Sequence, residues 1–210
     1  MPTPPPYINR RRHLLLGVVL LVLLQGCAGT GLNEGKTTSA QPVASAEARA
    51  EFERAVAILK SGQPSVALPL FQDMAKRYPT LAGVQVNIGI IHLQGGQTDA
   101  ATAAFKRAIA INPGNAVAHH HLGIAYRQGG RFDAAREAYL QALKLNPDYA
   151  HAHLNLGILY DLYLQQLEQA LQHYQQFQRL AASEDKQVDN WVIDLERRIA
   201  ARQPASAGDS

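Results

Sequence analysis

The hydrophobic and polar positions of the chain repeat with a period of 34 residues between about residues 48 and 182. Four kinds of residue keep this spacing. They are the prolines Pro79, Pro113 and Pro147, the glycines Gly62, Gly96 and Gly130, the alanines Ala67, Ala101 and Ala135, and the aromatic residues Phe71, Phe105 and Tyr139. Independent series that share one period indicate an array of structural repeats.

Each repeat is predicted to be a pair of helices. Glycine pairs such as Gly95-Gly96 end the first helices. The prolines end the second helices, because proline has no amide proton and pushes the preceding residue out of the α region. Small residues such as Gly89 and Gly123 let the helices approach one another closely. The units are predicted at 48–81, 82–115, 116–149 and 150–182.

The first and fourth units depart from the pattern. Unit one has Arg54-Ala55 where a leucine and a glycine are expected, as a terminal unit can. In unit four the later matches, Ala170 and Tyr174, come one residue late. The inserted residue falls near 162–167 and replaces the glycine turn. Residues 161–164 then form either a longer turn or an extension of the first helix.

One more amphipathic helix is predicted after the array. Apolar residues recur at helical spacing behind an acidic start, and they are Val188, Trp191, Val192, Leu195 and Ile199. We expect residues 183–202 to cap the open end of the array, with Trp191 in the capping core. Residues 203–210 are predicted to be disordered.

The first part of the chain predicts an export signal. Arg10, Arg11 and Arg12 precede an apolar run of eleven residues from Leu14 to Leu24. Such a run rises only about 16 Å as a helix, well short of the roughly 30 Å hydrocarbon core of a bilayer. It is therefore interpreted as the apolar part of a signal peptide. The small and polar residues that follow predict a flexible tether.

The sequence Leu24-Gln25-Gly26-Cys27 resembles the lipobox of bacterial lipoproteins. The resemblance implies a signal peptide at 1–26, acylation of Cys27 and a tether at 27–47. Several acyl chains anchor a protein stably, at about 0.8 kcal/mol per buried methylene. Ala28, in place of an aspartate, implies an outer-membrane protein that faces the periplasm. Two alternatives stay open: a buried cysteine beside a signal cleaved elsewhere, and a short uncleaved anchor.

The repeats themselves resemble a known family. In the third unit, the residues Leu122-Gly123, Tyr126, Ala135, Tyr139, Ala142 and Pro147 match the pattern of tetratricopeptide repeats (TPR). The resemblance covers about 48–182 and implies an all-α fold, a right-handed α-solenoid of about four helix hairpins plus the capping helix. It also implies a concave groove, lined by the first helices, that binds a protein or peptide partner.

The register of the repeats selects the side chains of this groove. The predicted partner-binding residues are Phe52, Val56, Val86, Asn87, Ile90, Leu93, His120, Ile124, Arg127, Leu154, Asn155 and Ile158. Most are aliphatic, which favours an amphipathic helix or an extended segment as the partner, with Arg127 and Asp161 setting the polarity of the rim. The alternative for any one of them is packing between neighbouring units.

The carboxylate clamp of the chaperone-binding TPR proteins is disfavoured. The register that would supply its first lysine and asparagine holds Phe52 and Val56. Its later cation positions hold Val117 and His121. The predicted groove therefore recognises its partner mainly by shape and apolar contact.

Composition and charge exclude several other classes. Aromatic residues make up only 7% of the chain, which favours helices over a β-sandwich. The single cysteine excludes a disulfide framework. The net charge of +3 comes from Arg10, Arg11 and Arg12, and removing them from the 20 Lys and Arg leaves 17 against 17 Asp and Glu. No nucleic acid is therefore expected as a partner.

The sequence shows no P-loop, dinucleotide-binding, zinc-protease or serine-hydrolase motif, so we predict neither catalysis nor a cofactor. The function predicted first is a lipid-anchored TPR scaffold for envelope, pilus or secretion-complex assembly, similar to pilotin-like lipoproteins or to adaptors of peptidoglycan hydrolases. The alternative is a periplasmic metal or small-ligand binding protein that uses His120, His121 and His151. No metal site is counted among the predicted sites, because adjacent side chains point about 100° apart on a helix, so the triplet His119-His120-His121 cannot supply three ligands to one ion.

Overall fold

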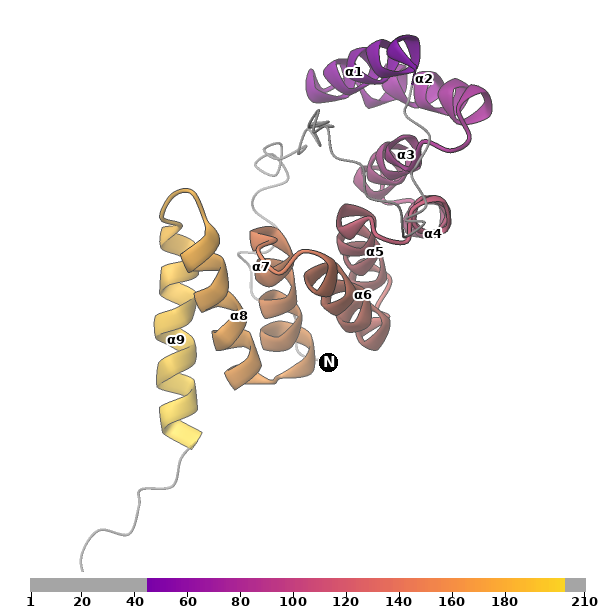
Figure 1. The fold of residues 1–210 in the computed structure, drawn as a ribbon. Helices are drawn as coiled ribbons and strands as arrows, with labels where there is room; N and C mark the ends of the chain where they lie inside the picture. Colours follow the sequence, from indigo (N-terminus) through magenta and orange to yellow (C-terminus); the bar gives the residue numbers. More distant parts are fainter. Residues whose placement is uncertain (1–44, 203–210) are drawn as a thin grey trace, which may run out of the picture.

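The computed structural model describes residues 45–202, and these fold as a stack of helices with no strand among them. The helices are α1 (Ala46–Lys60), α2 (Pro64–Arg77), α3 (Ala82–Gln94), α4 (Thr98–Ile111), α5 (Ala116–Gln128), α6 (Phe132–Leu145), α7 (Ala150–Leu159) with its π-helical continuation η2 (Tyr160–Leu164), α8 (Leu167–Leu180) and α9 (Lys186–Arg202). They follow one another along an arc from α1 to α9 (Figure 1). The predicted all-α solenoid is confirmed.

Three of the predictions fall wholly or largely outside the described residues: the signal peptide, the lipidated Cys27 with most of the tether, and the tail at 203–210. Among the helices of residues 45–202, none combines the length and the apolar character that a membrane crossing requires.

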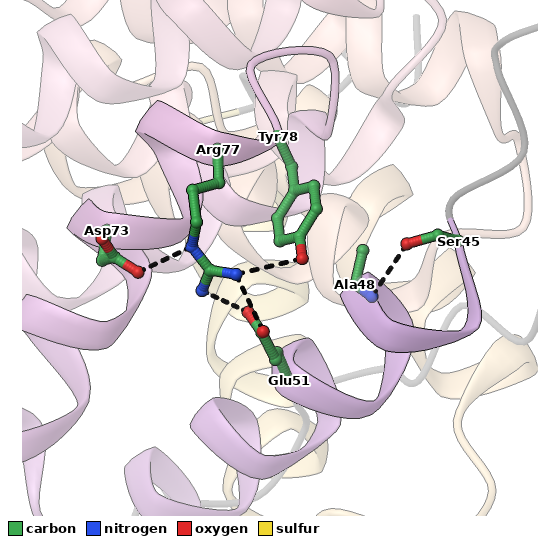
Figure 2. A network of polar contacts seen from close by, with 6 residues as sticks. All are labelled: Ser45, Ala48, Glu51, Asp73, Arg77 and Tyr78. Carbon is green, nitrogen blue, oxygen red and sulfur yellow. Dashed lines mark hydrogen bonds and ion pairs between the residues drawn. The ribbon is translucent and has the colours of Figure 1, made fainter.

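The tether ends earlier than predicted. Helix α1 begins at Ala46, two residues before the predicted start of the array. Ser45 is its N-cap, and the Ser45 hydroxyl accepts a hydrogen bond of 3.1 Å from the amide of Ala48 (Figure 2). Glu47 places a negative charge in the first turn, where it interacts favourably with the positive end of the helix dipole. This cap, which repeat spacing does not reveal, starts the helix.

The turns inside the first three hairpins use glycine in the left-handed region. Gly62, Gly96 and Gly130 have φ angles of 81°, 73° and 72°. A residue with a Cβ is strained in this conformation, so the 34-residue glycine series reflects a backbone requirement.

The fourth hairpin accommodates the inserted residue in another way. Helix α7 runs on into the π-helical turn η2, so the extension of the first helix, one of the two alternatives, is the one observed. Gln165 then takes the left-handed conformation with a φ of 54°, and the amide of Gln166 bonds the carbonyl of Tyr160 at 2.9 Å. A π turn absorbs one extra residue without breaking the helix.

A buried aromatic ring locks each of the later hairpins. The ring comes from the second helix and lies against a glycine of the first helix. A Cβ built on Gly89 would lie 2.4 Å from the ring of Phe105, and one on Gly123 would lie 2.6 Å from the ring of Tyr139. Gly157 stands in the same relation to Tyr174, also at 2.6 Å. The small residue is needed because the ring occupies the space of a methyl group.

The first helices also contact one another along the array. Helix α3 packs on α5 as well as on α4, and α5 packs on α7. Successive second helices of residues 45–202 make no comparable contact. The first helices α3, α5 and α7 therefore form the inside of the arc, and α1, whose Phe52 lies against Gly83 of α3, continues this surface, called here the inner face.

The two ends of the array are held by different contacts, polar at the α1 end and apolar between α8 and α9. At the α1 end, Arg77 of α2 contacts Asp73, the Tyr78 hydroxyl and Glu51 of α1 (Figure 2). At the other end, α9 covers α8, with Val188 and Leu195 buried. The Trp191 ring lies 5.3 Å from that of Tyr174.

Candidate functional site

Four of the predicted groove residues belong to the core and are removed from the partner-binding set. Val56 and Val86 are 4% and 5% exposed, and Asn87 and His120 are 5% and 4% exposed. Val86, for example, packs in one cluster with Ala108 and Ala118 of the neighbouring helices. Val56 and Val86 share core clusters with residues of the following hairpin, and His120 contacts Tyr149 and Asn155, which is the packing alternative described above.

The other predicted residues keep part of their surface open on the inner face. They are Phe52, Ile90, Leu93, Ile124, Arg127, Leu154, Asn155 and Ile158, and all are half-buried. Their apolar members pack sideways against the core clusters while one side remains accessible. The result is an apolar stripe from α1 to α7.

The α5–α7 part of the inner face carries a chain of five polar side chains, called here the polar network. Tyr149 and His120 approach at 3.1 Å between the hydroxyl and Nδ1, and His120 Nε2 lies 3.1 Å from Nδ2 of Asn155. Arg127 Nη2 donates to Oδ1 of Asn155 at 3.3 Å, and Arg127 Nε donates to the Tyr139 hydroxyl at 3.4 Å. The network thus joins α5, α6 and α7.

Asn155 is held in one orientation inside the network. Its Nδ2 donates to the backbone carbonyl of His151 at 2.9 Å. A carbonyl can only accept, so the amide nitrogen must face it, and Oδ1 is directed at Arg127. The same Nδ2 donates to Nε2 of His120, which leaves the His120 proton on Nδ1 for the Tyr149 hydroxyl.

The histidines of this region are neutral at pH 7. Burial, reinforced by His121 and His151, holds the pKa of His120 well below 6.5. Burial, with a smaller contribution from His151, lowers the pKa of His121 to about 4. Burial also lowers the pKa of His151. None of these rings contributes positive charge to the inner face at neutral pH.

One position of the repeat on the inner face holds a polar side chain in three successive units. Asn87, His121 and Asn155 occupy the same place in successive units, 34 residues apart. Asn87 Nδ2 bonds the carbonyl of Gly83 at 2.9 Å, as Asn155 bonds that of His151. Asn87 Oδ1 and His121 Nδ1 are the buried side-chain atoms of residues 45–202 without a hydrogen-bond partner. The His121 ring is stacked on Phe105 at 5.6 Å.

Asp161 does not share the rim with Arg127 as predicted. It is 8% exposed, and it forms an ion pair of 2.9 Å with Arg198 of α9. Burial raises the pKa of Asp161, and Arg198 opposes the rise. Asp161 lies in the π turn that follows α7, and this turn places its carboxylate next to α9. The ion pair therefore links α9 to the end of α7.

Two histidines outside the polar network make structural contacts. His119 and His153 hold equivalent places, and their Nε2 atoms lie 3.1 and 3.0 Å from the carbonyls of Pro113 and Pro147. His153 also contacts His173 at 2.9 Å between the Nδ1 atoms. Within residues 45–202, no three His, Cys, Asp or Glu side chains are grouped so that they could hold a metal ion.

Sequence reasoning missed three tyrosines of this surface. Tyr139 was counted only as a hydrophobic repeat position, although its hydroxyl reaches Arg127. Tyr149 precedes α7, and Tyr163 lies in η2 with its ring centroid 5.9 Å from the Arg127 guanidinium carbon. The presence of tyrosine where phenylalanine would pack equally well is the one available signal for Tyr139.

Comparison with known proteins finds a family model that is similar to part of the array. A family model described as TPR repeat matches residues 89–129 and 123–162. Residues 89–162 of the chain are thus similar to TPR repeats. The two matches together run from α3 to η2, and this stretch includes the residues of the polar network. No curated protein sequence matches the chain significantly.

Solved structures, among them two whose titles describe TPR proteins, share the fold. PilF of Pseudomonas aeruginosa superposes with a TM-score of 0.65 at 19% identity, over 74% of this chain and 70% of that one. The TPR protein TTC0263 of Thermus thermophilus gives 0.61 at 21% identity, over 72% and 82%. The first TPR of Spaghetti (RPAP3), bound to an HSP90 peptide, gives 0.53 at 24% identity, over 57% and 93%. At these identities the likeness establishes the fold.

Proposed function

We propose that the protein is a non-catalytic TPR scaffold that binds a protein or peptide partner on its inner face. The observation that carries the proposal is the apolar stripe of half-buried residues from Phe52 to Ile158. Burying such side chains against a partner is favourable by about 25 cal/mol per Å² of apolar surface. An amphipathic helix or an extended segment has the shape that fits a stripe of this kind.

The proposal includes a lipid anchor at Cys27 and a location at the outer membrane, facing the periplasm. It is supported by the lipobox-like residues 24–27 behind a basic and apolar leader. A scaffold held near the membrane by a tether would recruit its partner there, and we propose envelope, pilus or secretion-complex assembly as the setting.

The anchor is tested by metabolic labelling. Cells that express the full chain or a Cys27→Ser variant are grown with an alkyne-tagged fatty acid. We expect label and membrane association for the wild type, and neither for the variant. Equal labelling of the two proteins would refute the lipid anchor.

The binding surface is tested by crosslinking in the native envelope. An Ile90→Glu, Ile124→Glu double variant places two charges on the inner face. A Leu140→Glu variant is the control, since Leu140 is 43% exposed on the second helix α6. We expect the double variant to lose the partners that the wild type and the control both capture. If all three capture the same partners, the inner face is not the binding surface.

A further inference from the structure

Helices α7 and α8 bring two histidines together on the fourth hairpin. Nδ1 of His153 on α7 lies 2.9 Å from Nδ1 of His173 on α8. Both side chains are half-buried, so the pair keeps some contact with solvent. The two rings lie outside the polar network and outside the histidine set considered from the sequence. They also take no part in the proposed binding surface.

The tautomer of His153 is fixed by its other ring nitrogen. Nε2 of His153 lies 3.0 Å from the carbonyl oxygen of Pro147, which can only accept a hydrogen bond. Nε2 therefore carries the proton, and Nδ1 presents its lone pair to His173. Histidines that ligate metals are held in this way, with the second nitrogen donating to a carbonyl or a carboxylate. His153 thus has the orientation of a preformed metal ligand.

His173 is held by an aromatic neighbour. Its ring is stacked on the buried ring of Tyr160, with 5.6 Å between the centroids and 12° between the planes. Burial, reinforced by His153, lowers the pKa of His173 to about 4, so the ring is neutral at pH 7. A neutral imidazole carries its proton on either nitrogen. With the proton on Nδ1, His173 donates to His153, and with the proton on Nε2, both Nδ1 atoms offer lone pairs.

The repeat provides an internal comparison for this pair. His119 has the place of His153 in the third unit, and its Nε2 lies 3.1 Å from the carbonyl oxygen of Pro113. The residue before the ring that locks the hairpin is Ala138 in the third unit and His173 in the fourth. The third hairpin therefore has one imidazole at a place where the fourth has two.

The separation of the two Nδ1 atoms favours one coordination geometry. Bonds from a metal to imidazole nitrogen are about 2.0 to 2.1 Å long. Two such bonds at a right angle place their nitrogens about 2.9 Å apart, whereas the tetrahedral angle places them about 3.3 Å apart. The observed 2.9 Å matches the right angle. Copper(II) prefers square-planar or tetragonal geometry and binds such donors most tightly among the common divalent metals.

We infer that His153 and His173 together bind a copper(II) ion through their Nδ1 atoms. Within residues 45–202, no third His, Cys, Asp or Glu side chain joins the pair, so water completes the coordination. The ion links α7 to α8 in the hairpin whose turn lacks the glycine of the other three. The inference goes beyond the proposed function and does not depend on it.

Calorimetric titration of the full-length, untagged protein in detergent with copper(II) tests the site. Each variant introduces the residue that another unit has at the same position. His173→Ala copies Ala138, and His153→Gln copies Gln85. His119→Ala is the control. We expect one bound copper ion per chain for the wild type and the control, and an affinity lower by about tenfold or more in each of the two variants.

Two further measurements do not depend on affinity. Electron paramagnetic resonance of the wild type with one equivalent of copper should show two imidazole nitrogens bound to the ion, and this readout needs no variant. Copper should also raise the urea midpoint of the wild type more than that of His173→Ala, because an ion that joins two helices binds the folded state.

The outcomes decide the inference separately from the scaffold. Equal copper affinity in the wild type, His153→Gln and His173→Ala would refute it, and so would a wild type that binds no copper. A resonance spectrum without two imidazole nitrogens, or zinc bound as tightly as copper, would also overturn it. None of these results changes the outcome of the crosslinking test on the inner face, so the two proposals fail independently.

Discussion

Gly123→Ala tests the aromatic lock of the third hairpin. The new methyl carbon would lie 2.6 Å from Cδ1 and Cε1 of Tyr139, whose ring is fully buried. Carbon atoms pack at about 3.5 to 4.0 Å, so the ring must retreat by about 1 Å. Overpacking of this kind costs about 1 to 3 kcal/mol, and the better helix propensity of alanine returns at most about 1 kcal/mol. We expect a net loss of about 1 to 2 kcal/mol.

The assay is urea unfolding followed by circular dichroism. Gly129→Ala, at the C-cap of the same helix, is the control, because its nearest contacts would be ordinary ones at 3.4 and 3.5 Å. That variant should stay within about 0.5 kcal/mol of the wild type. Tyr139→Leu should cost less in the Gly123→Ala background than in the wild type. If Gly123→Ala proves as stable as Gly129→Ala, the ring does not lock the hairpin.

Three further predictions concern charge. The unfolded chain takes up a proton on His121 near pH 6.5, whereas the folded chain does so only near its pKa of about 4. Stability is therefore lost as the pH falls from 7 to 5, by about 2 kcal/mol for this group, and urea unfolding of His121→Asn should show a correspondingly smaller loss. Arg198→Ala leaves the buried Asp161 carboxylate unpaired and should cost about 1 to 3 kcal/mol, whereas Asp161→Asn should cost less; the opposite order in unfolding experiments would contradict this account. Arg77→Gln should lower the unfolding midpoint slightly at low salt and leave it unchanged at high salt, since the ion pairs of Arg77 are exposed.

The helical fold and the turns between its helices could be predicted from the repeat period, because each of these features has a local cause in the sequence. A left-handed turn requires glycine at Gly96 and Gly130, and a buried ring requires a small residue at Gly123. The start of α1 at Ala46 escaped prediction because a single hydroxyl, that of Ser45, caps it. The choice at the fourth turn also stayed open, since a loop and a π turn both absorb one residue.

The accessibility of the predicted groove residues could be predicted only in part. Register alone placed the predicted residues on the first helices, and it found the stripe that includes Ile90, Ile124 and Ile158. It could not separate these from Val86 and His120, because burial depends on how far the next hairpin overlaps each helix. Nor could it foresee that Asp161 would pair with Arg198, which lies 37 residues further along the chain.

The repeat architecture, the number of hairpins and the candidate lipidation residue follow from the sequence by itself, because period, turn chemistry and short motifs are local properties of the chain. Which side chains remain accessible, and which charge remains unbalanced, was decided only by the tertiary structure. Arg127 has the same residue type as Arg77 and Arg198, yet it alone of these three contacts no acid in the described chain. Charge balance depends on which groups meet in space, and packing determines this.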